Sequence, residues 1–172
     1  SGEALPREFM RAPYLQFIYL EDNLLDSPLM PVTPPGSAPS QSGSFDLASV
    51  RILSLARNRI GGSIPYDYGT LPIFKANAVQ VQTGGGTQVL VHSLDLSGNL
   101  LSGHAPDWMS YTRYSAYIRV NVTGNRFACP IPSSLAYMAL HCYDPATDGT
   151  GTRQQVVNPG GISGATGTGT DT

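Results

Sequence analysis

Four segments of the chain repeat one pattern around an asparagine, and this repetition constrains the fold more than any other feature of the sequence. The four asparagines are Asn23, Asn58, Asn99 and Asn125. Apolar residues stand eight, five and three positions before each asparagine, and the last two alternate with more polar residues, as in a half-buried strand. One unit of this size cannot bury its apolar edge alone, so we expect the four units to stack around one continuous core.

The register of the repeat predicts which side chains point inward. The expected core residues before the asparagines are Leu15, Ile18, Leu20, Val50, Leu53, Leu55, Val91, Leu94, Leu96, Tyr117, Val120 and Val122. The apolar residues two positions after the asparagines should also point inward: Leu25, Ile60, Leu101 and Phe127. We expect each asparagine side chain to bond to backbone groups where the chain turns, so that the stacked asparagines form a buried ladder. Farther along, Gly62 and Gly103 suit a tight bend.

The four copies resemble the plant-type leucine-rich repeat, whose consensus reads LxxLxLxxNxLxGxIP. The second and third copies match best, whereas the fourth has Cys129 in place of the glycine and the first has Ser27 there and Met30 in place of the proline. The resemblance covers residues 4–140. It implies an α/β repeat solenoid, right-handed, with a short parallel sheet of four strands, irregular turns or short helices on the convex side, and extended loops.

Two long insertions interrupt the regular spacing. The asparagines are 35, 41 and 26 residues apart, against a family period of roughly 24 residues. The first insertion is the Pro/Ser/Gly-rich segment 31–43, and the second lies between Tyr66 and Leu90 and contains three consecutive glycines from Gly84. We expect both to emerge from the outer side of the solenoid, away from the strands, as decoration or as a second contact surface.

The predicted domain is residues 1–147, followed by a Gly/Thr-rich tail, residues 148–172. The tail has too little apolar content to form a core, so it is a linker, an O-glycosylated segment or a segment that orders on another subunit. Residues 4–14 resemble the outer half of a preceding coil, so further repeats or another chain are expected to cover that edge. Phe9 and Trp108 occupy equivalent outer positions and should fill the core.

Two features favour an extracellular or cell-surface location. Cys129 and Cys142 stand in and just past the last repeat, where a disulfide would seal a terminal cap of residues 129–147; the alternative is a pair of reduced, buried thiols. Asn121-Val-Thr123 is an N-glycosylation sequon at an outward strand position, and the alternative is two ordinary polar residues.

Chemistry beyond binding has little support in the sequence. A net charge of −2 without a basic run lacks the footprint for nucleic acid, and the apolar stretch near Leu15 is far too short to span a bilayer. His92 alternates with Ser93, so these two cannot join Asp95 in a catalytic triad. His104 and His141 are isolated, the segment 144–149 lacks the acids of a calcium loop, and the Gly84 triplet lacks the lysine of a phosphate loop. We therefore predict no enzyme activity, cofactor or metal.

The surface expected to matter is the outward face of the sheet. Its predicted positions are Phe17, Tyr19, Glu21, Ile52, Ser54, Ala56, Ser93, Asp95, Ser97, Arg119, Asn121 and Thr123. Aromatic and arginine side chains are favoured interface anchors, and Arg51, Arg57 and Arg59 cluster near the second coil. The candidate partner surface is Phe17, Tyr19, Glu21, Arg51, Arg57, Asp95 and Arg119.

Three functions fit this surface. The first is a non-enzymatic extracellular recognition or adhesion module that binds a protein or carbohydrate partner. The second is a structural glycoprotein subunit that binds further copies of itself to form a filament or coat. The third is an intracellular scaffold, if the cysteines are reduced and Asn121 is unmodified.

Overall fold

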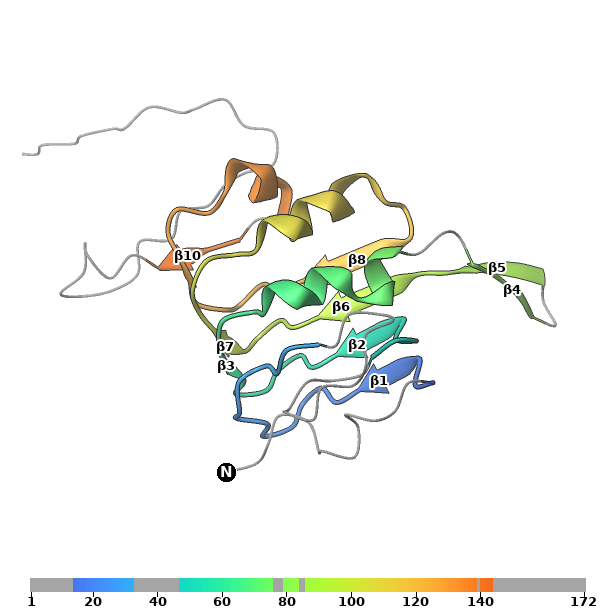
Figure 1. Cartoon of the computed structure of the whole chain (residues 1–172), viewed down its shortest axis with the longest axis horizontal. Coiled ribbons are helices and arrows are strands. Elements are labelled where there is room, and N and C mark those ends of the chain that lie inside the picture. The colour runs from blue at the N-terminus through green and yellow to red at the C-terminus, as the bar shows by residue number, and fades with distance from the viewer. Residues whose placement is uncertain (1–13, 33–46, 76–78, 84–85, 139, 144–172) are drawn as a thin grey trace, which may run out of the picture.

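The computed structural model describes residues 14–32, 47–75, 79–83, 86–138 and 140–143. Each repeat contributes one strand to a parallel sheet with the order β1-β2-β6-β8. The strands are β1 (Phe17–Tyr19), β2 (Ile52–Ser54), β6 (His92–Asp95) and β8 (Ile118–Asn121). Their register aligns Ile18, Leu53, Leu94 and Val120, all five positions before an asparagine. The predicted sheet and its repeat alignment are therefore present (Figure 1).

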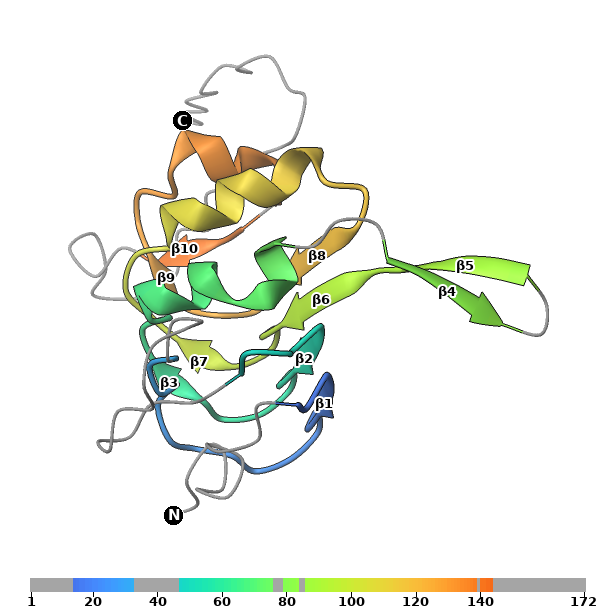
Figure 2. The ribbon, with the colours of Figure 1, turned by 45° about the vertical axis from the view of Figure 1, so that its right-hand side comes forward.

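After the asparagine turns at Asn58, Asn99 and Asn125, the chain continues through a second set of short strands and then through 3-10 helices. β3 (Gly61–Gly62) pairs in parallel with β7 (Leu100–Leu101), and β9 (Phe127–Ala128) pairs in parallel with β10 (Cys142–Tyr143). The helices are η2 (Tyr66–Thr70), η3 (Pro72–Lys75), η4 (Asp107–Tyr114) and η5 (Ser133–Met138). Figure 2 shows the coils stacked from β1 at one end to β10 at the other.

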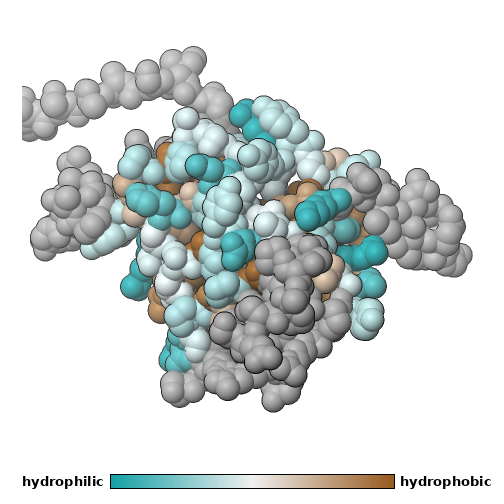
Figure 3. All heavy atoms as spheres, viewed as in Figure 1, coloured by the Kyte–Doolittle hydropathy of each residue, from teal (hydrophilic) through white to brown (hydrophobic). Residues whose placement is uncertain are grey.

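The core lies between the sheet and the 3-10 helices. Inward leucines of the strands are fully buried, and the helices contribute Tyr68, Trp108, Met109 and Leu135. Each such buried apolar side chain contributes about 1.5–3 kcal/mol relative to exposure. Trp108 fills the core as its position predicts, and its ring centroid lies 4.9 Å from that of Phe74. On the face in Figure 3, polar residues cover this interior, and strongly hydrophobic residues are visible only between them.

Two of the inward and outward predictions were wrong. Tyr117 was expected in the core, but 36% of its surface is exposed. Its position precedes β8, so strand alternation does not fix its direction, and the segment arriving from η4 does. Ala56 was expected on the outward face but is buried.

The second insertion forms a β-hairpin that the sequence did not predict. β4 (Val79–Thr83) and β5 (Gly86–Leu90) are antiparallel, and only Val91 separates β5 from β6. The hairpin projects from the start of a sheet strand (Figure 1), so the expectation that this insertion emerges away from the strands was wrong. Of the first insertion, 31–43, residues beyond Val32 lie outside the described residues.

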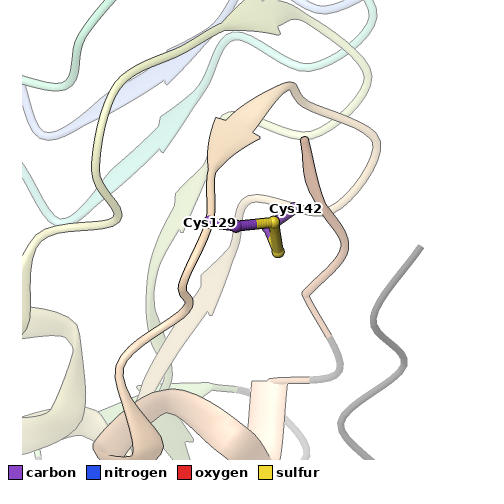
Figure 4. Close-up of a disulfide and its surroundings, with 2 residues drawn as sticks. All are labelled: Cys129 and Cys142. Atoms are coloured by element: carbon purple, nitrogen blue, oxygen red, sulfur yellow. A yellow bond between two sulfur atoms is a disulfide. The ribbon is translucent and has the colours of Figure 1, made fainter. Parts of the chain in front are cut away.

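Beyond β9 the described chain continues through η5 and β10, and a disulfide links these segments. Cys129 and Cys142 are bonded, with Cα atoms 5.0 Å apart, and the bond joins the end of β9 to β10 (Figure 4). The structure describes the predicted cap, 129–147, as far as Tyr143, with the exception of residue 139. The tail 148–172, the segment 144–149, and Phe9 with the rest of residues 4–13 lie outside the described residues.

Candidate partner-binding surface

The outward face of the sheet carries two rows of side chains that the register defines. The first row is Phe17, Ile52, Ser93 and Arg119, and the second is Tyr19, Ser54, Asp95 and Asn121. Ile18, between the two aromatic residues of β1, is buried, so both rings stand on the opposite face. Phe17 is 44% exposed and Tyr19 58% exposed. Two large apolar rings therefore stand side by side at one edge of this face.

An ion pair flanks the aromatic pair. Arg57 donates from Nε to Oδ1 of Asp22 over 2.6 Å and from Nη2 to Oδ2 over 2.5 Å. The hydrogen bond from Arg57 lowers the pKa of Asp22, and the same bond raises the pKa of Arg57. Sequence reasoning selected Arg57 as an anchor but left Asp22 out of the site. Because its charge is already paired, Arg57 is a weaker anchor for a partner than a free arginine.

The other charged candidates are distributed unevenly. Arg119 is exposed and Asp95 half-buried, and both belong to the two rows. Glu21 is half-buried, and one of its carboxylate oxygens has no hydrogen-bond partner among the described residues. Arg51 precedes β2, takes the position equivalent to His92 and is half-buried. Of the candidate surface residues, four lie in the two rows: Phe17, Tyr19, Asp95 and Arg119. Glu21 and Arg57 follow strands β1 and β2, and Arg51 precedes β2.

The geometry around His92 gives no support for catalysis. His92 is buried, and its pKa is lowered by burial and, to a smaller extent, by the charge of Arg51. Ser93 and Asp95 lie on the opposite face of β6, so these three residues do not form a triad. In the part of the chain that the structure describes, no three His, Cys, Asp or Glu side chains are grouped to hold a metal ion. No helix in the same ranges has the length and apolar character to cross a membrane.

The asparagines hold the coils in register beneath this surface. Asn99 donates from Nδ2 to the carbonyl oxygen of Leu55 in the preceding coil over 2.9 Å and to its own turn, and its Oδ1 accepts from the Ile60 N–H over 3.1 Å. Asn58 and Asn125 make the same set of bonds one coil earlier and one coil later. The ladder is directional from the second coil on, since Asn58, Asn99 and Asn125 each bond to the coil before them. The first predicted member, Asn23, is exposed and donates to carbonyls of its own turn.

The residue before each asparagine has a left-handed backbone. The φ angles are +57° at Asp22, +53° at Arg57, +63° at Gly98 and +69° at Gly124. These four positions stack, because the Arg57 N–H bonds to the Ser97 carbonyl and the Gly98 N–H to the Thr123 carbonyl, each over 2.8 Å. We call the stack of these four positions the left-handed ridge. In the first two coils its residues are Asp22 and Arg57, whose side chains form the ion pair beside the aromatic rings.

The sequon lies at the other edge of the same face. Asn121 is exposed in β8, and the Thr123 hydroxyl donates to Asn121 Oδ1 over 2.9 Å. Asn121 shares a row with Tyr19 but is three strands away, which corresponds to roughly 14 Å. A glycan on Asn121 would cover this end of the sheet and leave the aromatic end open.

A second aromatic group lies on the helical side, and sequence reasoning did not identify it. Tyr111 and Tyr114 of η4 are strongly exposed, and the Arg113 guanidinium lies 5.5 Å from the ring centroid of Tyr114 and 5.8 Å from that of Tyr137. The sequence feature that could have indicated this group is the run Tyr111-Thr-Arg-Tyr114, which places two tyrosines close to an arginine. Tyr137 is held in place, because its hydroxyl donates to the Met109 carbonyl over 2.7 Å.

One repeat is also recognised by a family comparison. A family model described as Leucine Rich Repeat matches residues 91–111, which contain β6, Asn99, β7 and the first part of η4. The other three coils repeat the strand and asparagine turn of this segment. The chain has the fold of a leucine-rich repeat solenoid. The resemblance and fold class predicted from the sequence are thus confirmed.

The chain is similar to solved structures of other proteins. The ectodomain of the Arabidopsis receptor kinase HAESA, in complex with an N-terminally extended IDA peptide hormone, aligns with 82% of this chain at 22% identity and a TM-score of 0.50. HAESA with IDA and the co-receptor SERK1 aligns with 77% at 22% identity and 0.49, and the Arabidopsis BIR3–SERK2 complex with 52% at 28% identity and 0.35. This solenoid spans 19%, 17% and 38% of those chains. A search of curated proteins finds no match.

Proposed function

We propose that this leucine-rich repeat solenoid is a non-enzymatic, extracellular recognition or adhesion module that binds a protein or peptide through the outward face of its sheet. The observation that carries the proposal is the pair of exposed rings, Phe17 and Tyr19, on one face of β1. Exposed aromatic side chains supply large contact areas at low entropic cost, and they are enriched among the residues that dominate interface energies.

The surroundings of the rings fit a protein partner. Ile52 extends the apolar contact onto the next strand, and the polar positions Asp95 and Arg119 lie farther across the sheet. An apolar centre with a polar rim is the common anatomy of protein interfaces. The Asp22–Arg57 pair belongs to this rim, where it contributes to orientation more than to affinity.

A peptide or protein partner is favoured over a carbohydrate by analogy of fold. The HAESA ectodomain structure with the same fold is a complex with a peptide hormone. At 22% identity this analogy supports the class of partner and not its identity. Carbohydrate binding remains the alternative for the two rings, since sugars also stack on exposed aromatic platforms.

The extracellular location is supported by the Cys129–Cys142 disulfide, because such bonds persist in oxidising compartments. Peptide mass mapping of protein from its native source, without reduction, tests it. A linked Cys129–Cys142 peptide and a glycan on Asn121 would support the location. Free thiols with an unmodified Asn121 would contradict it and favour the intracellular scaffold.

Selection from a phage-displayed library of random peptides tests the recognition surface. Peptides enriched on the wild-type chain are measured against the double variant Phe17→Ser/Tyr19→Ser and against the matched variant Tyr111→Ser/Tyr114→Ser on the helical side. We expect roughly tenfold or greater loss of affinity for the first variant and none for the second. Equal affinity for all three proteins, or loss only with the second variant, would overturn the proposal. A glycan array with the same proteins distinguishes the carbohydrate alternative.

A further inference from the structure

The β4–β5 hairpin is an isolated two-stranded sheet. Its strands pair over five positions, from Val79 opposite Leu90 to Thr83 opposite Gly86, and in the described ranges neither strand has a second neighbour. Figures 1 and 2 both show it standing clear of the stacked coils. Within the described residues, each strand therefore presents one edge of backbone groups without a strand partner. A two-stranded hairpin of this kind is marginally stable alone in water.

The sequence does nothing to protect these edges. Neither β4 nor β5 contains a charged residue or a proline, although natural proteins commonly place lysine or proline on exposed edges to prevent pairing with other chains. β4 reads Val-Gln-Val-Gln-Thr, an alternation with high strand propensity and no glycine. β5 begins with Gly86, which weakens a strand, so β4 has the better edge for pairing.

We propose that two copies of this chain pair antiparallel along β4, so that two hairpins join into one four-stranded sheet. A two-fold axis at Val81 would place Val81 opposite the partner's Val81 and Gln80 opposite the partner's Gln82. The strand is complementary to itself in this register, because apolar positions meet apolar or threonine positions and amides meet amides. No charge opposes the contact or selects a different, charged partner.

The expected assembly is a closed dimer. A contact in which both copies use the same strand is isologous, and it leaves no equivalent surface free to bind a third copy. The filament predicted as an alternative from the sequence requires contacts between two different surfaces. The dimer contact is separate from the sheet face with Phe17 and Tyr19, so each copy keeps that face free. Its failure would leave the proposed recognition function untouched.

Sedimentation equilibrium of the purified chain over a hundredfold range of concentration tests the dimer. We expect a monomer–dimer equilibrium for the wild type and dimerisation weakened roughly tenfold or more in Val81→Lys, because two lysines would face each other at the axis. Val81→Glu should fail in the same way. An equimolar mixture of the two variants should recover a dimer containing one copy of each, which a misfolded variant could not do.

Leu24→Lys is the matched control, since Leu24 is 73% exposed in the first coil and the variant gains the same charge away from the hairpin. It should dimerise as the wild type does. A wild type that stays monomeric throughout, a Val81→Lys variant that dimerises normally, or a mixture that stays monomeric would each overturn the proposal. Species larger than a dimer would overturn the closed contact in favour of a filament.

Discussion

The turns of the first and third coils contain the same motif but very different interactions. Asn23 is exposed, and within the residues that the structure describes it donates only to carbonyls of its own turn, those of Leu20 and Glu21. Asn99 is buried, and it adds two bonds to the preceding coil, from Nδ2 to the Leu55 carbonyl and from the Ile60 N–H to Oδ1. The motif alone therefore does not determine how much an asparagine contributes. Its contribution depends on the neighbouring coil, as expected where stability is a sum of interfaces between repeats.

The comparison predicts a large difference between two identical substitutions. Asn99→Ala removes every bond of a buried amide and leaves buried backbone groups unpaired, so the free energy of unfolding should fall by about 3 kcal/mol or more. Asn23→Ala removes two exposed bonds within one turn and should change it by about 1 kcal/mol or less. Urea denaturation of both variants and the wild type measures the two losses.

Asn58→Ala is the matched control, because Asn58 makes the same set of bonds one coil earlier. Its loss should resemble that of Asn99→Ala. Equal losses at Asn23 and Asn99 would show that the turn itself, and not the contact with the preceding coil, carries the stability.

The repeated parts of the fold were predictable because the sequence states them four times. The spacing before each asparagine gives the strand register, which the aligned row of Ile18, Leu53, Leu94 and Val120 confirms. The hairpin was not predictable in the same way, because its sequence occurs only once. No second repeat contains an equivalent segment with which its pattern could be compared. The prediction that Tyr117 is buried was wrong for a related reason, since Tyr117 lies outside the strand whose alternation the repeat defines.

The left-handed ridge gives the next largest effect. A Cβ at Gly124 would lie 3.3 Å from the Gly98 backbone, at a φ of +69° that side chains avoid. Gly124→Ala should therefore destabilise the chain by about 1–3 kcal/mol. Gly61→Ala is the control, because its Cβ would come no nearer than 4.0 Å to the Leu100 carbonyl oxygen and its φ is not left-handed. Thermal denaturation compares the two, and a Gly124→Ala variant as stable as Gly61→Ala would contradict the close stacking.

A buried histidine distinguishes the third coil from the second at another equivalent position. His92 is buried and its pKa is lowered chiefly by burial, whereas Arg51 at the equivalent position is half-buried. Because the folded-state pKa lies below the unfolded value of about 6.5, stability is complete above that pH and falls as the pH drops below it. In urea denaturation, the free energy of unfolding of the His92→Leu variant should change less between pH 7.5 and 5.5 than that of the wild type. A wild type equally stable at both values would contradict it.

The site was less predictable than the fold, because it depends on contacts between coils that no single motif displays. Phe17 and Tyr19 follow directly from strand alternation, and both are exposed where the pattern placed them. Arg57 also falls on this side, but its bond to Asp22 joins residues 35 positions apart. Only the stacking of two left-handed turns brings these side chains together.

The ion pair gives the smallest expected effect and the finest test of the ridge. Asp22 and Arg57 carry side chains at positions where the later coils have glycine, so their bond could offset the strain of a left-handed backbone. Exposed pairs are screened by salt, and the coupling between the two residues in a double-mutant cycle of Asp22→Asn and Arg57→Gln should shrink as salt is added. It should also vanish in acid, since the lowered pKa of Asp22 contributes stability only while the carboxylate is ionised. Coupling that persists in high salt and acid would mean that packing along the ridge, rather than charge, joins the first two coils.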